Sequence, residues 1–501
     1  MRTLNIRQFI HSLAIGGAAL AAGLLSQAAK ASVATSTDTP NVVIVMADDL
    51  GWGDISAYQK KSLIKTPNID KLVSQGLSFT DAHSSASVCT PSRYGLLTGR
   101  YCWRTSLKKE VLHGYSPLLI DADTPTIGKL FQSRGYKTAC IGKWHLGLDW
   151  QTKDGVSVNK QGKNVVFSKR VTCGANECGF DYSFVTGGCS KIDPPHVFIE
   201  NGKCTVEPTE WYKVRGKGKD NSARTGFADP NFPFKDVDKI YTEKAIEFIT
   251  ANKAGHFFVY LPLSAPHAPF WPADFAKGKT HSKRGDLVWQ ADWCVGQVEA
   301  ALQKLDLAEN TILIFTSDNG PREGKGGHDP SGPYRGLKTH TWEGGHRIPL
   351  VVHWPGVVKP NAKSDQLIEL NDLFASFATM LSKPLSGKAG PDSIDMLTVI
   401  KGQTPQKPLR THTIHHSNFG VFAIRHENWK LILGTKGSGG WVTPGDKSVK
   451  QSIPHNETGQ LYDIAKDPYE TTDLYEQKPE VVKAITKLLD GFKESGRSVK
   501  R

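Results

Sequence analysis

The stretch NVVIVMADD, residues 41–49, is a run of seven mostly apolar residues that ends in two aspartates. The same pattern occurs three more times: TACIG (138–142) runs into Lys143, Trp144 and His145, FFVYLPL (257–263) into Ser264 to His267, and TILIFTS (311–317) into Asp318 and Asn319. Short, continuously apolar runs of this kind are typical of strands buried on both faces of a parallel sheet. The sequence therefore predicts four buried strands with polar groups at their carboxyl ends.

Helical patterns separate these strands along the chain: NIDKLVSQG, TIGKLFQSRG, TEKAIEFITA and WQADWCVGQVEAALQKL. Strands that alternate with helices predict an α/β fold, here a large mixed, mostly parallel sheet flanked by helices. Ligands of such sheets bind outside the carboxyl ends of the strands. We therefore expect the four polar clusters to meet at one edge.

The chain after about residue 400 has a different pattern. FGVFAIRHENWKLILG predicts two antiparallel strands joined by a turn, and PEVVKAITKLLDGFKESG predicts a terminal helix. ELNDLFASFATMLS (369–382) is expected to be the last helix of the large domain, with residues 383–410 as the connection. The predicted organisation is a large domain over 32–400 and a small subdomain over 401–501, made of an antiparallel sheet and one helix.

The first 31 residues resemble an export signal. Arg2 and Arg7 precede the apolar run SLAIGGAALAAGLL, which ends near an A-x-A pattern at residues 29–31. The run is short for a membrane span, and no stop-transfer flank follows it, which disfavours an uncleaved anchor. We expect residues 1–31 to be removed and the mature protein to be periplasmic or secreted, with no membrane span.

Composition and charge narrow the class of protein. In 501 residues, 39% hydrophobic and 22% charged side chains are typical of a soluble globular protein, not of a disordered chain. The formal net charge of +13 favours a polyanionic partner, although an excess of lysine can also serve solubility alone. Because no basic helical stripe and no nucleic-acid motif occurs, we expect an anionic substrate and no nucleic acid.

Eight cysteines in an oxidising compartment predict disulfides. Four of them fall between Cys173 and Cys204, so one or two bridges across this segment are expected, with the pairing left open. Cys89 could pair with Cys102 or serve another purpose. In the second case seven cysteines remain, and at least one thiol stays free, with Cys140 or Cys294 as the expected candidates.

The two acidic clusters predict a metal site. Asp48 and Asp49 from one strand end and Asp318 and Asn319 from another supply oxygen ligands, without sulfur or imidazole, which suits Ca²⁺ or Mg²⁺ better than zinc. The alternative is a solvated turn or a helix cap. It is weakened because charges at the ends of buried strands are costly without a partner.

CTPSRYGLLTGR, residues 89–100, predicts the start of a helix. Pro91 suits the first helical turn, and Leu96 and Leu97 continue the pattern. A group at Cys89 would face the helix N-terminus, which favours negative charge, and Arg93 lies one turn on along the same face. This position suits an oxyanion or an activated nucleophile.

This segment resembles the signature of type I sulfatases, C-x-P-S-R followed by L-L-T-G-R. The resemblance extends over nearly the whole mature chain through the segments GKWHLG, APHAPF, TSDNG, RGLKTHTWEGGHRIPL, WKLI and LYDIAKDPYE. It implies an alkaline-phosphatase-like fold and a formylglycine-dependent sulfuric ester hydrolase of the kind that bacteria use on polysaccharides.

The resemblance also implies roles for individual residues. Cys89 would be oxidised by a maturation enzyme to formylglycine (3-oxoalanine), whose hydrate attacks sulfur with one oxygen and expels sulfate with the other. One Ca²⁺ would be held by Asp48, Asp49, Asp318, Asn319 and the modified Cys89. The remaining roles are orientation and deprotonation of the diol by Arg93 and His145, sulfate binding by Lys143 and Lys338, protonation of the leaving alcohol by His267, and a contact near the diol by Ser190.

The expected substrate is a sulfated carbohydrate. Export, positive charge and a set of aromatic and cationic side chains expected near the rim favour a sugar sulfate; the set comprises Trp103, Arg104, His196, Trp271, Arg335, His340, Trp342, His346, His415 and His416. Arg335, His346 and His415 are the substrate contacts we expect from it. The segment GFDYSFVTGGCSKIDPPHVFIEN resembles sulfatases that act on glycosaminoglycans or carrageenan-type galactans.

Two other functions stay open at this point. One is a phosphate or phosphonate ester hydrolase of the same superfamily, which the two lysines and single calcium disfavour relative to a monoanionic sulfate ester. The other is a catalytically silent protein that binds sulfated glycans.

Overall fold

The first strand, β1 (Asn41–Ala47), is buried along its whole length in the structure, a computed structural model. The structure describes residues 39–213, 223–434, 438–440, 456 and 458–499, so the predicted signal peptide lies outside the described residues. Val42, Ile44 and Met46 pack into one hydrophobic core and Val43, Val45 and Ala47 into another. Side chains alternate between the faces of a strand, so β1 separates two cores.

The central sheet has ten strands in the order β13-β2-β12-β11-β1-β10-β4-β5-β6-β7. Its middle strands, β11 (Thr311–Ser317), β1, β10 (Phe257–Pro262), β4 (Lys137–Lys143) and β5 (Tyr182–Thr186), are mutually parallel. Antiparallel pairs occur on both sides, β11 with β12 (Leu350–His353) and β5 with β6 (Ile199–Glu200). The predicted α/β fold with a large mixed, mostly parallel sheet is confirmed.

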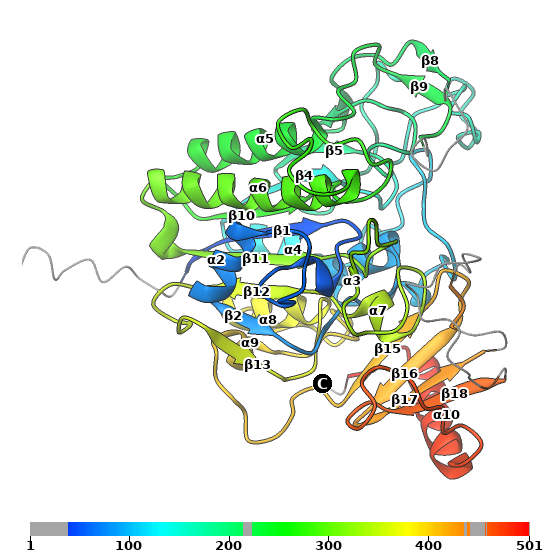
Figure 1. Ribbon diagram of the computed structural model, residues 1–501. Coiled ribbons are helices and arrows are strands. Elements are labelled where there is room, and N and C mark those ends of the chain that lie inside the picture. The colour runs from blue at the N-terminus through cyan, green and yellow to red at the C-terminus, as the bar shows by residue number, and fades with distance from the viewer. Residues whose placement is uncertain (1–38, 214–222, 435–437, 441–455, 457, 500–501) are drawn as a thin grey trace, which may run out of the picture. The chain divides into compact units, whose positions relative to one another are not determined.

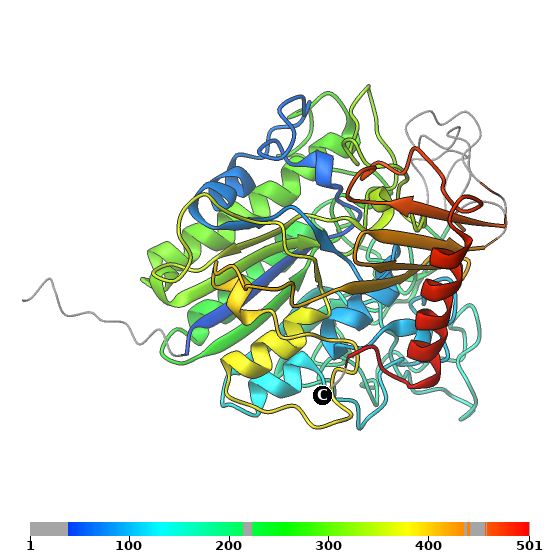
Figure 2. The same cartoon turned by 90° about the horizontal axis from the view of Figure 1, so that it is seen from below.

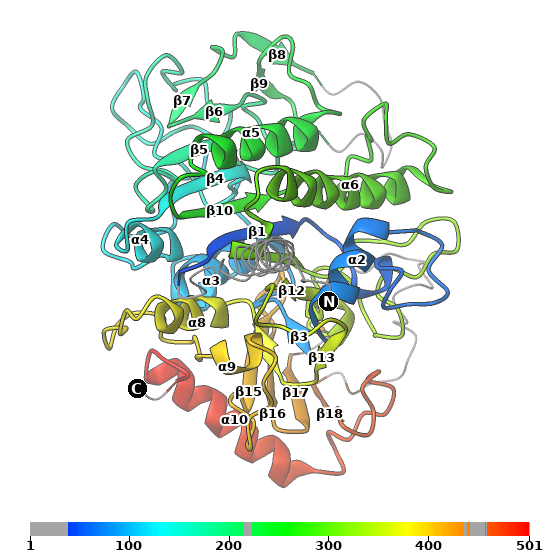
Figure 3. The same ribbon diagram turned by 90° about the vertical axis from the view of Figure 1, so that its left-hand side faces the viewer.

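Helices cover both faces of this sheet (Figures 1 and 3). One core contains residues of α2 (Pro67–Gln75), α5 (Val237–Ala251) and α6 (Lys283–Lys304). The other contains residues of α3 (Cys89–Thr98), α4 (Ile127–Gln132), α8 (Asp372–Met380) and α9 (Leu397–Ile400). α6 begins six residues before the helix that the sequence predicts over 289–305, because Ser282 caps its first turn.

The other elements complete the large part of the molecule. They are β2 (Leu77–Phe79), β3 (Ala82–His83), β7 (Lys203–Cys204), β8 (Glu210–Tyr212), β9 (Gly226–Ala228), β13 (Ala362–Ser364), β14 (Ile368–Glu369), the short helix α7 (Glu343–His346) and the 3-10 turns η1 (Trp52–Asp54), η2 (Cys102–Arg104) and η3 (Ala308–Asn310).

A four-stranded antiparallel sheet follows, formed by β15 (His412–His416), β16 (Phe422–His426), β17 (Trp429–Leu433) and β18 (Gly459–Asp463). Helix α10 (Pro479–Glu494) lies against it, as Figure 2 shows, and Ile485 and Leu489 pack with Ile424 and Leu431. The small antiparallel sheet with one helix is as predicted. Residues Asn41–Arg501 form one compact unit, which contains both sheets.

The polar ends of the central strands lie next to one another because β4, β10, β1 and β11 are adjacent and parallel. Their carboxyl ends lead to Lys143, His267, Asp48 and Asp318 respectively. The sheet thus brings together clusters that are up to 270 residues apart in sequence, as the hydrogen bond between Asp49 and Asn319 shows.

The cysteines differ from the prediction. All eight are free thiols, so neither a bridge between Cys89 and Cys102 nor a bridge within 173–204 is present. The thiols of the second group lie in different surroundings: Cys178 is in the core, Cys189 lines a cavity, and Cys204 lies in β7. Among the described residues, no helix is both long and apolar enough to cross a membrane.

Candidate active site

Three carboxylates and one amide meet at the carboxyl ends of β1 and β11. The amide of Asn319 donates to Asp49 Oδ1 (2.8 Å), and the backbone N–H of Asp49 donates to Asp318 Oδ1 (3.2 Å). Asp48, Asp49, Asp318 and Asn319 are all at most 1% exposed. The predicted metal ligands therefore form one buried cluster.

The oxygen atoms of this cluster suit a divalent cation. Asp49 Oδ2 and Asn319 Oδ1 are buried and accept no hydrogen bond, and buried polar atoms are rarely left without a partner. Burial and the neighbouring Asp48 carboxylate raise the pKa of Asp318. A hard cation bound between these oxygens would satisfy both orphaned atoms and relieve the repulsion.

Cys89 is the first residue of α3, as predicted, and is 2% exposed. Its thiol lies 3.4 Å from Asp48 Oδ1, and the ammonium of Lys338 donates to its sulfur (3.2 Å). Burial and the Asp318 carboxylate raise the pKa of this thiol well above its usual range, despite Lys143 and Lys338. An unmodified Cys89 is therefore held as a thiol, which is a poor nucleophile compared with a thiolate.

Arg93 supports the acidic cluster. Its guanidinium donates twice to Asp318 Oδ2 (2.9 and 2.7 Å) and once to the carbonyl oxygen of Lys143 (2.8 Å). We expected Arg93 to reach back to position 89. The structure pairs it with Asp318, a partner that no local sequence pattern predicts because it follows a strand 225 residues away.

The strand β4 ends in Lys143 and His145. The Lys143 ammonium donates to Asp48 Oδ2 (2.6 Å), and this carboxylate raises the pKa of Lys143 although burial opposes it. His145 adopts a left-handed backbone (φ 55°), and its Nε2 lies 2.7 Å from the carbonyl oxygen of Leu112. Burial and the charge of Lys143 lower the pKa of His145 well below its usual value, so its imidazole is neutral.

Lys338 and His267 lie next to Asp49 of the acidic cluster. Lys338 Nζ lies 2.6 Å from Asp49 Oδ1, and His267 Nε2 lies 3.5 Å from Asp49 Oδ2. His267 Nδ1 is 2.5 Å from the carbonyl oxygen of Ala268, which fixes a proton on Nδ1. Burial and Lys338 together lower the pKa of His267 well below its usual value.

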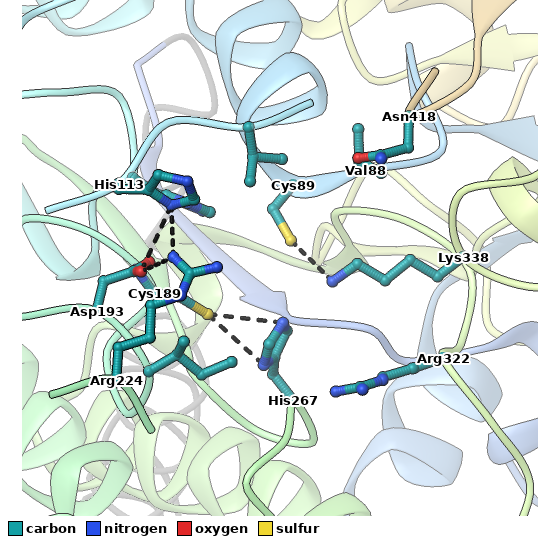
Figure 4. A pocket seen from close by; sticks show the side chains of 13 residues that line it. Val88, Cys89, His113, Cys189, Asp193, Arg224, His267, Arg322, Lys338 and Asn418 are labelled. Atoms are coloured by element: carbon teal, nitrogen blue, oxygen red, sulfur yellow. Dashed lines mark hydrogen bonds and ion pairs between the residues drawn. The ribbon is translucent and has the colours of Figure 1, made fainter. Parts of the chain in front are cut away.

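These groups border a cavity of about 230 Å³ (Figure 4). Cys89, His145, His267 and Lys338 line it, whereas Asp48, Asp49, Asp318 and Arg93 lie behind them. The lining also includes residues that the sequence did not single out: Val88, Val111, His113, Cys189, Ile192, Asp193, Arg224, Arg322 and Asn418. A negatively charged group bound here would face Lys338, with Cys89 beside it.

One wall of the cavity is formed by a group of three polar side chains, as Figure 4 shows. Asp193 is almost fully buried and accepts a hydrogen bond from the backbone N–H of Cys189 (2.8 Å). Arg224 donates to its carboxylate, and His113 Nδ1 lies 3.5 Å from it. These residues come from three separate loops with no motif between them, so only the tertiary structure could reveal the group.

Ser190 does not face the cavity. Its hydroxyl is hydrogen-bonded to Thr186 (2.8 Å) and Tyr241 (3.2 Å), and the residue is 1% exposed. The preceding Cys189 lines the cavity instead, with its sulfur 3.6 Å from both ring nitrogens of His267. The motif GGCSK thus pointed to the right loop, and Cys189 is the member of it that contacts the candidate site.

Arg335, His346 and His415 also lie outside the cavity lining. Arg335 donates to Tyr462 Oη (3.0 Å) and stacks over Trp342 (4.0 Å). His346 and His415 stack on each other with ring centroids 3.7 Å apart, and both are at most 2% exposed. All three lie where the small sheet packs against the large part of the molecule, so their contacts are structural.

The other aromatic and cationic side chains expected at the rim are likewise absent from the lining of this cavity. Trp103 belongs to the core under the small sheet, Arg104 pairs with Asp392 (2.8 Å), and His196 is fully buried. Neither Trp271, His340, Trp342 nor His416 lines the cavity. Residue type alone did not separate a rim position from an interface between two sheets.

Comparisons with known proteins agree with this arrangement. The sulfatase family model matches residues 40–382. The chain is 34% identical to the N-acetylgalactosamine-6-O-sulfatase of Bacteroides thetaiotaomicron, over 91% of this chain and 94% of the relative, and 30% identical to human arylsulfatase A, over 93% and 89%.

Solved structures give the same result. A structure from work on the metabolism of multiple glycosaminoglycans by Bacteroides thetaiotaomicron matches with a TM-score of 0.80 and 33% identity, over 91% of this chain and all of that one. A phosphonate monoester hydrolase of Agrobacterium radiobacter shares the fold, with a TM-score of 0.59, 16% identity and coverage of 91% and 96%. From the family match, the relatives and the fold together, the chain belongs to the sulfatase family and is a sulfuric ester hydrolase.

Proposed function

We propose that this sulfatase removes sulfate from a sulfated carbohydrate, of the glycosaminoglycan or carrageenan-type galactan class, with a formylglycine made from Cys89. The observation that carries the proposal is the position of Cys89, at the N-terminus of α3 and at the wall of a cavity, between Lys338 and the acidic cluster. The similarity to the N-acetylgalactosamine-6-O-sulfatase of Bacteroides thetaiotaomicron favours a hexosamine 6-sulfate.

The residues that hold the sulfate are the two lysines. Lys338 lines the cavity and Lys143 lies behind the lining, each 2.6 Å from a carboxylate oxygen of the acidic cluster. Sulfate-ester cleavage places negative charge on the nonbridging oxygens, and fixed cations at these oxygens stabilise that charge. Both ammonium groups are buried, so they need no reorganisation when the substrate binds.

The acidic cluster would hold Ca²⁺ through Asp48, Asp49, Asp318 and Asn319. The two orphaned oxygens, Asp49 Oδ2 and Asn319 Oδ1, support this assignment. When bound, the ion would supply positive charge next to the sulfate and the modified Cys89. Arg93 donates to Asp318 and Lys143 to Asp48, so these two ligands are oriented before an ion arrives.

Proton transfer is assigned to the two histidines of the cavity. His145 is buried and neutral, so its imidazole can accept a proton from the nucleophile. His267 keeps one proton on Nδ1 through Ala268, so it can act as an acid only from Nε2 and only after Nε2 has taken up a second proton. Asp49, 3.5 Å from Nε2, and the negative charge of a bound sulfate ester would favour this imidazolium, which returns to the neutral ring when Nε2 gives its proton to the leaving alcohol. A sugar alcohol is a poor leaving group as an anion, and this step would therefore matter most for a carbohydrate substrate.

The size of the cavity favours one sulfated sugar unit. Pockets for drug-sized ligands measure about 300–1,000 Å³, whereas this cavity has about 230 Å³. We therefore propose that a terminal sugar enters and the rest of the glycan lies outside. His113, Asp193 and Arg224 offer hydrogen-bond donors and acceptors to its hydroxyl groups.

The proposal includes export and maturation. A periplasmic or secreted location, cleavage after about residue 31 and the action of a formylglycine-generating maturation enzyme are expected from the sequence. The predicted cleavage site lies outside the described residues, and maturation involves a second protein.

The test uses the full chain produced with a maturation enzyme. Mass spectrometry of the peptide that contains residue 89 should find an aldehyde, and the protein should release sulfate from 6-sulfated hexosamine oligosaccharides. The control is Cys89→Ala, whose methyl side chain has no thiol or hydroxyl from which the aldehyde could be made. An intact thiol together with saturable binding of the same sugars would favour a silent glycan-binding protein. Turnover of phosphate or phosphonate esters alone would contradict the choice of ester.

A further inference from the structure

The loop after β1 holds a metal-ligand candidate in an unusual backbone conformation. Asp49 has φ 65°, in the left-handed region that residues other than glycine rarely adopt. Such a conformation is strained and persists only where the surroundings enforce it. The question is therefore which residues hold Asp49 in place.

A buried ion pair lies directly behind this loop. Arg284, near the start of α6, donates from both terminal nitrogens to the two carboxylate oxygens of Asp54, each at 2.7 Å. The same guanidinium donates to the carbonyl oxygen of Asp49 (3.3 Å). Asp54 in turn accepts a hydrogen bond from the backbone N–H of Gly51 (2.7 Å). The pair thus contacts the loop both at Asp49 and two residues beyond it.

The opposite side of the loop is fixed by the segment 328–332. His328 Nε2 lies 2.9 Å from Asp54 Oδ1, and the backbone N–H of Gly53 donates to the carbonyl oxygen of Pro330 (2.8 Å). A Cβ atom at Gly51 would lie 2.0 Å from that carbonyl oxygen, so the two backbones are in direct contact. The loop is therefore in contact with both α6 and this segment.

The carboxylate that this loop carries is central to the site. Asp49 Oδ1 pairs with the ammonium of Lys338 and accepts a hydrogen bond from the amide of Asn319. Asp49 Oδ2 accepts no hydrogen bond, which leaves it available to a cation. A change in the backbone of Asp49 would move both oxygens together. Neither Arg284 nor Asp54 lines the cavity, so neither can act on the substrate directly.

We propose that Arg284 and Asp54 are positioning residues, which hold the left-handed backbone of Asp49 so that its carboxylate is preset for the divalent cation. The inference rests on the proposed function in one respect, the calcium site. Its consequence is that breaking the pair lowers the calcium affinity by more than the accompanying loss of folding stability would explain.

The pair persists over the working pH range. Burial opposes ionisation of Asp54, but the adjacent Arg284 outweighs it and lowers the pKa of Asp54 to about 2. Asp54 therefore stays ionised at any pH at which the protein would be assayed.

The test compares two lysine substitutions in the full-length protein. Arg284→Lys keeps the charge but loses the bidentate geometry and the third hydrogen bond to Asp49. Arg410→Lys is the matched control, because Arg410 is equally buried and makes a bidentate pair with Asp372 far along the chain from the acidic cluster. Calcium affinity is measured by isothermal titration of chelator-stripped protein, and unfolding temperature is measured with and without calcium.

We expect R284K to bind calcium about 10–100-fold more weakly, as is common when an outer partner of a metal ligand is lost. R410K should lower the calcium-free unfolding temperature by a similar amount and leave the calcium affinity unchanged. If R284K does not fold, His328→Asn removes one hydrogen bond from Asp54 and should weaken calcium binding by a smaller factor.

Calcium affinity of R284K equal to that of the wild type would overturn the inference, and so would equal losses in R284K and R410K. A wild type that desulfates its substrate without binding calcium would overturn the calcium site itself. The two failures are therefore distinguishable.

Discussion

Replacing His267 with alanine tests the assignment of the leaving-group acid. His267 lines the cavity and is 7% exposed. Its Nδ1 proton is held by Ala268, and Nε2 lies 3.5 Å from Asp49 Oδ2, on the side of the acidic cluster. Loss of this imidazole removes the only proton donor that we assign to the leaving oxygen.

The expected size of the effect depends on the leaving group. General acid catalysis contributes about 10²–10⁴-fold, which corresponds to roughly 2.7–5.4 kcal/mol of barrier at 1.36 kcal/mol per factor of ten. For a sugar sulfate we expect H267A to lose kcat over this range. A nitrophenyl sulfate releases nitrophenolate, a weak base that can leave without a proton. Its kcat should therefore fall less than about tenfold.

The assay measures kcat and KM for both substrates with wild type, H267A and the control His113→Ala. His113 lines the same cavity but is half exposed at the side-chain level, and its replacement should change KM for the sugar more than kcat. Equal losses of kcat for the sugar and the nitrophenyl ester in H267A would refute the assignment, because a proton donor cannot act equally on both. A raised KM with an unchanged kcat in H267A would indicate that His267 has a binding role.

Three further predictions concern the nucleophile, the metal and the stability. Cys89→Ala should abolish turnover but lower the free energy of unfolding, measured in urea, by only about 1 kcal/mol, and residual sulfate release would contradict its role. Removal of calcium with a chelator should abolish turnover and lower the unfolding temperature in calorimetry. An ion at 100 times its Kd adds about 2.7 kcal/mol to the free energy of unfolding, and its loss leaves the carboxylates of Asp48 and Asp318 without a shared cation. An unchanged unfolding temperature would count against a metal site. Burial and the nearby Asp372 raise the pKa of Glu369 from its ordinary 4.5 to about 8, so the folded protein keeps a proton that the unfolded chain loses, and stability falls as pH rises from 4.5 to 8. Urea titrations at pH 5, 6.5 and 8 should find a flatter pH dependence in Glu369→Gln, and an unchanged slope would be inconsistent with a proton on Glu369.

The sequence predicted the central strands well because their signal is local. TILIFTS and NVVIVMA are continuous apolar runs, and both strands have the bounds that these runs indicate. The start of α6 was missed because its first turn, with Lys283 and Arg284, is polar, and its boundary depends on the cap at Ser282. Burial of Arg284 against Asp54 is a tertiary contact that no local pattern contains.

The same distinction applies to the candidate site. Cys89, His145, His267 and Lys338 stand in motifs or at strand ends, and the fold brings them to one cavity. Ser190 was predicted one residue away from Cys189, because a loop gives no periodicity from which to infer which side chain faces inward. The wall formed by His113, Asp193 and Arg224 has no sequence signal of its own, since it arises from the packing of distant loops.

The sequence also could not distinguish an interface between two sheets from a substrate rim. Arg335, His346 and His415 have the side chains that a sulfated sugar requires, yet each is buried between the large part and the small sheet. Whether such a residue meets solvent or another sheet depends on where β15 and β18 dock, which is a long-range property.

The docking of the small sheet has a consequence for any attempt to shorten the enzyme. Lys430 of β17 places its ammonium 2.9 Å from Glu343 and 2.8 Å from Glu470, all three fully or almost fully buried. A truncated chain that stops near residue 400 would lose Lys430 and leave Glu343 with Arg347 (2.8 Å) as its remaining partner, and it would uncover the buried surface on which the small sheet packs. It would also remove Asn418 from the cavity wall. The carboxy-terminal hundred residues are thus required by the rest of the fold. Exchanging them between homologues requires Lys430, Glu343 and Glu470 to be exchanged together.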